Sequence, residues 1–90
     1  MDAEDYKEFK ERAKAAKYAL QESNTDIIVN WCVENEVQFF PLMTWQIRLS
    51  HDGKMLDIFT QSKKWHDILN NERGQIKGEI TEFLNNHFGL

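Results

Sequence analysis

The chain has 90 residues, 41% of them hydrophobic and 29% charged, with a formal net charge of −4, so it forms one small globular domain and is not a disordered chain. Cys32 is the only cysteine, which excludes an internal disulfide and a thiolate zinc cluster, and the acidic balance argues against strong nonspecific binding to nucleic acid. The sequence has neither an apolar run of about 20 residues nor a basic, apolar leader, so we expect a cytoplasmic protein that does not span a membrane.

The first third of the chain has the pattern of two helices. Between Ala3 and Gln21, apolar residues recur at intervals of three and four and form one stripe, Tyr6, Phe9, Ala13, Ala16 and Leu20. We expect this helix to lie on the domain's own sheet, and pairing with a helix of another molecule is the alternative. Ser23-Asn24-Thr25 is expected to break it and to cap a second helix that runs to Glu34-Asn35.

A meander of strands is expected to follow. Val37–Phe40 has the character of a short strand, which Pro41 would end because proline lacks a backbone donor. Asp52-Gly53 is a preferred centre of a type I′ turn, so it predicts a hairpin between strands at about 44–50 and 55–60. The turn also fixes the register of that hairpin.

The hairpin register separates an apolar row from a charged pair. Counting outward from the turn pairs Arg48 with Asp57 on one face of the sheet. The other face carries four apolar residues, Ile47, Leu49, Leu56 and Ile58. Together with the helix stripes, this predicts a core that includes Trp31, Ile47, Ile58, Ile80 and Phe83.

The segment from Gln61 to Gly74 fits either a helix or a strand. We favour a third strand at 63–68, which a tight turn at Gln61-Ser62 would pair so that Trp65 lies opposite Ile58. Asn70-Asn71 and Gly74 then form the loop before a final helix with the stripe Ile76, Ile80, Phe83, Leu84 and Phe88, ending at Gly89. The whole chain, residues 1–90, is thus expected to be one α+β domain with two N-terminal helices, a three- to four-stranded antiparallel meander and a C-terminal helix.

The same register predicts a polar row of Arg48, Asp57 and His66 across three strands. A carboxylate between a guanidinium and an imidazole could hold one histidine tautomer or bind an anionic group. The alternative, which we favour, is a charge ladder that satisfies itself on the sheet surface. The dipeptides His51-Asp52 and His66-Asp67 are too few ligands for a metal site. We expect no metal, no cofactor and no enzyme activity, and a small enzyme built on Arg48, Asp57 and His66 is the disfavoured alternative.

Three apolar residues, Met55, Phe59 and Ile68, are expected on the same outward face as the polar row. Such a face is too apolar to stay bare, so the first helix, a second subunit or a partner protein should cover it. The sequence accordingly favours a noncatalytic interaction or accessory protein that binds through this face, with a homodimer as one form of that interaction.

A basic cluster supports a second hypothesis, a small RNA-binding module. Lys63, Lys64 and Arg73 lie close to Trp65 in the sequence, and Lys77 follows. The order of strands and a last helix resembles double-stranded-RNA-binding domains, in which a Ser-Lys-Lys-like motif implies a clamp on the RNA backbone. This hypothesis gains if the cations share one face away from Asp67 and Glu72, and loses if they are interleaved with those acids.

The stretch Leu56–His66, followed by Arg73-Gly74 and an amphipathic helix, resembles small uncharacterised proteins of bacteriophages and bacterial mobile elements. The resemblance covers about half of the chain. It implies two helices before a short meander and a phage or mobile-element origin. It implies no known activity.

Overall fold

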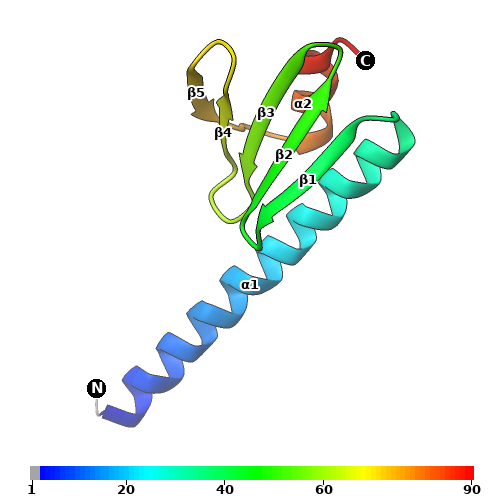
Figure 1. Ribbon diagram of the computed structural model, residues 1–90. Coiled ribbons are helices and arrows are strands. Elements are labelled where there is room, and N and C mark those ends of the chain that lie inside the picture. The colour runs from blue at the N-terminus through cyan, green and yellow to red at the C-terminus, as the bar shows by residue number, and fades with distance from the viewer. Residues whose placement is uncertain (1–2) are drawn as a thin grey trace.

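The fold is a five-stranded antiparallel sheet with one helix before it and one after it (Figure 1). A computed structural model describes the backbone of residues 3–90 and the side chains of residues 19–90. In chain order the elements are α1 (Ala3–Glu34), β1 (Gln38–Met43), β2 (Gln46–His51), β3 (Lys54–Phe59), β4 (Lys64–Asp67), β5 (Glu72–Gln75) and α2 (Ile80–Phe88). The strands lie in the order β1-β2-β3-β4-β5, so each pairs with its neighbour in sequence. The α+β class is confirmed, but the expected numbers of helices and strands are wrong.

No helix in the described part of the chain is both long and apolar enough to cross a membrane.

One helix, α1, replaces the two that were expected, because it continues through Ser23-Asn24-Thr25. The Thr25 hydroxyl donates a hydrogen bond to the backbone oxygen of Gln21 (2.7 Å), within the helix. The Asn24 side-chain amide donates to the backbone oxygen of Thr60 (2.6 Å), beyond β3. Both polar side chains therefore find partners without ending the helix.

The N-terminal half of α1 runs past the sheet (Figure 1). Most of the apolar stripe expected on this half lies outside the residues whose side chains are described. Leu20, its last member, is half exposed.

Pro41 does not end the first strand, contrary to expectation. Strand β1 continues to Met43, with a shift of register between Pro41 and Met43. It is an edge strand, so one side of its backbone needs no partner, and a proline is tolerated there.

The hairpin register from β2 to β4 is confirmed. Asp52 and Gly53 have φ values of 48° and 77°, as a type I′ turn requires. Across the sheet, Arg48 pairs with Asp57, and Asp57 pairs in turn with His66. Residues 63–69 contain a strand, β4, as favoured, although the turn before it spans four residues instead of two.

Strand β5 occupies a segment that was expected to be a loop. It pairs with β4 so that Gly74 lies opposite Trp65. A Cβ atom at Gly74 would lie 2.6 Å from Cζ2 of Trp65, so only glycine fits against this ring. The final helix begins at Ile80, while Ile76, expected to start its stripe, is buried in the preceding loop.

The core lies between the two helices and one face of the sheet, which we call the inner face; the sheet contributes Ile47, Leu49, Leu56 and Ile58. Helix α1 contributes Ile28, Trp31 and Cys32, and α2 contributes Ile80, Leu84 and Phe88. Four of the five predicted core residues are buried, and Phe83 is partly buried with its ring centroid 5.5 Å from that of Trp65. Both helices pack on the inner face, so no described segment covers the opposite one, the outer face.

Candidate functional site

The outer face carries one row of side chains across all five strands, Phe40, Arg48, Asp57, His66 and Arg73. The register confirms the predicted placement of Arg48, Asp57 and His66 in one row. It also extends that row at both ends, with Phe40 on β1 and Arg73 on β5. The remaining outer-face residues lie on either side of this row.

The Asp57 carboxylate accepts hydrogen bonds from Arg48 and Gln46 and not from His66. Arg48 donates to both of its oxygens, from Nε (2.8 Å) and Nη2 (3.1 Å), and Gln46 Nε2 donates a third bond (2.9 Å). The hydrogen bond to Asp57 raises the pKa of Arg48 above its usual range. His66 instead lies 3.3 Å from Asn71, from Nε2 to Oδ1. Arg48 and Asp57 thus form the self-satisfied ladder that the sequence favoured.

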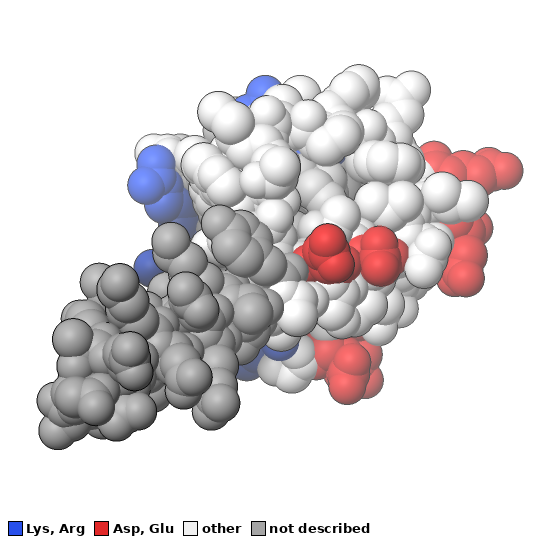
Figure 2. Space-filling view, turned by 90° about the horizontal axis from the view of Figure 1, so that it is seen from below, with Lys and Arg blue, Asp and Glu red and all other residues white. Residues whose placement is uncertain are grey.

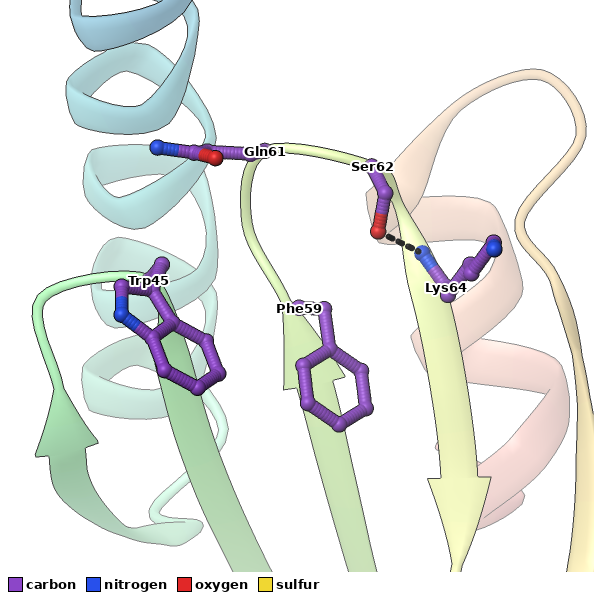
Figure 3. A pocket seen from close by; sticks show the side chains of 5 residues that line it. All are labelled: Trp45, Phe59, Gln61, Ser62 and Lys64. Carbon is purple, nitrogen blue, oxygen red and sulfur yellow. Dashed lines mark hydrogen bonds between the residues drawn. The ribbon is translucent and has the colours of Figure 1, made fainter.

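An aromatic pair, Trp45 and Phe59, lies beside this row. The ring centroids are 6.2 Å apart and the ring planes differ by 18°. Figure 3 shows the two rings side by side on the face turned away from the helices. Trp45 is 42% exposed. The sequence predicted a strand from about residue 44, which would have placed Trp45 on the inner face with Ile47. Strand β2 instead begins at Gln46, so Trp45 lies in the preceding turn and points outward. Sequence reasoning therefore missed this residue.

Two shallow hollows adjoin the aromatic pair. The first is lined by Trp45, Phe59, Gln61, Ser62 and Lys64 (Figure 3). The second is lined by Phe59, Lys64, Trp65, His66, Arg73 and Gly74. Because Phe59 and Lys64 belong to both, the hollows form one continuous surface from the β1–β2 turn to β5.

Two cations on this surface are separated from the nearby acids. Side chains alternate along strands, so Lys64 and Arg73 lie on the outer face, while Asp67 and Glu72 lie on the inner one. Asp67 accepts hydrogen bonds from Asn70, which hold the pKa of its carboxyl below the usual value. Within residues 19–90, neither Lys64 nor Arg73 makes an ion pair.

Charges are unevenly distributed on the side of the molecule seen in Figure 2, although a smaller basic group at the lower edge lies beside acidic atoms. The largest group of basic atoms lies at the upper left of this view. The acidic atoms lie near its centre, at the right and along the lower edge. The net negative charge of the chain therefore does not describe every part of its surface.

The predicted basic patch is only partly assembled. Lys63 lies in the β3–β4 turn, where its Nζ donates to the backbone oxygen of Gly78 (2.8 Å). Trp65 faces inward, with its ring centroid 6.1 Å from that of His87. Of the four predicted members, only Lys64 and Arg73 reach the outer face. Trp65 borders the second hollow, but its ring packs against Phe83 and His87 on the inner side.

The outer face remains uncovered in the described residues. Met55, Phe59 and Ile68 are each partly buried. Helix α1 packs on the inner face, so it is not the cover that the sequence required. Phe40 and Met43 add to the exposed apolar area of this face. That a second subunit or a partner covers the outer face stays a prediction.

Two other types of site find little support in the structure. The described residues contain no group of three or more His, Cys, Asp or Glu that could hold a metal ion. Cys32 is fully buried, and burial raises the pKa of its thiol to about 12, so it is not a reactive thiolate.

The resemblance of Leu56–His66 to proteins of phages and mobile elements stays a prediction. Comparisons of the chain with protein-family models, with curated proteins and with solved structures found no significant match, so its function has to be argued from the outer face itself.

Proposed function

We propose that this chain is a noncatalytic binding module and that the outer face holds a macromolecular partner. One observation carries the proposal: an aromatic pair, of which Trp45 is 42% exposed, lies beside two cations on a face that both helices leave open. A contiguous exposed apolar patch on a small protein often marks an interaction site. Aromatic and arginine side chains also supply much of the energy in known binding surfaces.

The outer-face chemistry supports binding over turnover. A general base must be oriented by a partner and reach a substrate proton. Asp57 already accepts three hydrogen bonds from Arg48 and Gln46, so it is not available to orient His66. The Arg48–Asp57 pair is therefore assigned a structural role in the sheet.

The shape of the surface supports a partner that lies across the strands. The two hollows share Phe59 and Lys64 and extend from Trp45 to Arg73. Such a path runs from the β1–β2 turn across three strands, β3, β4 and β5. An extended ligand would contact the aromatic pair first and the cations next. A role as an accessory protein of a phage or mobile element belongs to this proposal as its expected context.

Site-specific photo-crosslinking in a bacterial lysate tests the outer face as the binding surface. A photoreactive amino acid replaces Met55 on the outer face or, as the matched control, Asn86, an exposed residue of α2. We expect adducts from position 55 and none from position 86, in variants whose melting temperatures match the wild type. Adducts from position 86 alone, equal adducts from both, or none from either would contradict the proposal. Phe59→Lys should abolish the adducts at position 55.

A further inference from the structure

We propose that the ligand of the outer face is single-stranded nucleic acid, an inference that rests on the proposed function and names its partner. Bases would stack on Trp45 and Phe59, and phosphates would contact Lys64 and Arg73. Proteins that bind single strands combine a positively charged path along the backbone with aromatic side chains on which bases stack. Both parts of that chemistry meet on this face.

The aromatic pair supplies the stacking surface. Trp45 and Phe59 lie side by side with planes only 18° apart, so neighbouring bases could rest on both with nearly the same tilt (Figure 3). Trp45 is 42% exposed although tryptophan is normally well buried. The other two tryptophans differ, because Trp31 is buried and Trp65 faces inward. The chain therefore presents one tryptophan ring to an outside ligand.

The charges of the outer face suit a phosphate backbone. Its strand residues, all of which are described, include the cations Arg48, Lys64 and Arg73 and a single carboxylate, Asp57. Arg48 and Gln46 already neutralise and shield that carboxylate. Lys64 lies directly opposite Phe59 in the register, so a strand stacked on the aromatic pair passes within reach of a cation. The face is net positive although the chain is net negative.

A single strand fits this surface better than a duplex does. Stacking on a protein ring requires bases whose faces are not already stacked in a helix. Duplex binding by charge depends on many phosphate contacts, whereas this face offers two cations that make no ion pair within residues 19–90. The double-stranded-RNA mode is further weakened by Trp65 facing inward and Lys63 binding Gly78.

Fluorescence titrations with defined probes test the inference. The probes are 12-nucleotide oligothymidylate DNA and oligouridylate RNA, a DNA duplex of equal length, and dextran sulfate, which is a polyanion without bases. We expect the single strands to quench tryptophan fluorescence and to gain anisotropy when labelled. The duplex should bind more weakly, and dextran sulfate should leave the fluorescence unquenched. The DNA and RNA arms show which backbone is preferred.

Variants assign the contacts, and thermal melting confirms that each is folded. Trp45→Phe should retain binding and lose the quench, whereas Trp45→Ala should weaken binding roughly 5- to 150-fold, as the loss of one stacked base does. Lys64→Gln and Arg73→Gln should each lower the slope of log affinity against log salt by about 0.7. Lys54→Gln is the matched control, because Lys54 bonds to the backbone of His87 on the helix side.

The inference is overturned if neither single strand binds at low salt, if dextran sulfate quenches equally, or if the duplex binds more tightly. Unchanged affinity of Trp45→Ala also overturns it. The failure of this inference can be distinguished from the failure of the proposed function. If the oligonucleotides do not bind but position 55 still crosslinks to a protein after nuclease treatment, the outer face is a protein-binding surface and only the inference falls.

Discussion

Replacing Gly74 with alanine tests how β5 packs on the rest of the sheet. The added Cβ would lie 2.6 Å from Cζ2 and 2.7 Å from Cε2 of Trp65, well inside the 3.4 Å at which ordinary contact begins. The indole has little room to retreat, because the ring centroids of Phe83 and His87 lie only 5.5 and 6.1 Å from its own. The methyl group must therefore displace either the ring or the edge strand.

The expected cost follows from two opposing effects. Overpacking a well-packed site costs about 1–3 kcal/mol. A glycine-to-alanine change at a compatible backbone position stabilises by about 0.4–1 kcal/mol through the unfolded chain, and Gly74 does not have a positive φ. The net loss should be about 1–2 kcal/mol. In a domain of this size it should lower the melting temperature by roughly 5–15 °C.

Urea and thermal unfolding of four proteins measure this effect: the wild type, Gly74→Ala, Trp65→Phe and the double variant. The smaller phenylalanine ring should relieve the clash, so Gly74→Ala should cost less in the Trp65→Phe background. Equal costs in the two backgrounds, or a stabilising Gly74→Ala, would refute the contact between Gly74 and the indole.

Three further predictions concern stability. Gly53→Val should cost about 1–3 kcal/mol in urea unfolding through backbone strain alone, because φ is 77° and nothing lies within 4 Å of the new Cβ; an unchanged midpoint would disprove the type I′ turn. Ile80→Ala should cost about 2–5 kcal/mol because Ile80 is 5% exposed, and a loss below about 1 kcal/mol would mean that α2 is not docked as described. Burial lowers the pKa of His87 below its ordinary 6.5, so between these two pKa values the unfolded chain binds more protons. The free energy of unfolding should therefore fall as pH drops below about 6.5, and His87→Gln should flatten this dependence; an unchanged pH profile would contradict it.

The parts of the fold that depend on local chemistry could be predicted from the sequence. Asp52-Gly53 fixes the β2–β3 hairpin, and the period-two alternation around it fixes which residues face inward. The continuity of α1 could not be predicted, because the partner of Asn24 is Thr60, 36 residues away. Strand β5 was missed because Glu72–Gln75 has no apolar alternation, and its stability depends on the nonlocal fit between Gly74 and Trp65.

The candidate site was predicted in part: Phe59, Lys64 and Arg73 reach the outer face as expected, whereas Trp45 was missed. The register that pairs Trp65 with Ile58 already places Trp65 on the inner face, so its inclusion in the basic patch was inconsistent with the alternation. Lys64 and Arg73 follow from the same alternation and reach the outer face. Trp45 could not be placed, because a shift of two residues in the start of β2 decides which face it reaches.

The purely sequential order of the sheet has a consequence for synthesis and folding. Each strand pairs with the next one along the chain, so every hairpin can form as soon as its second strand leaves the ribosome. The helices behave differently, because α1 is made first and yet packs against α2, which is made last. A hydrogen bond from Trp31 to Asn85, 54 residues later in the chain, joins the two helices. A nascent chain that stops before Ile80 therefore carries a finished sheet and a helix with part of its apolar face still exposed to water, a state that favours binding to chaperones.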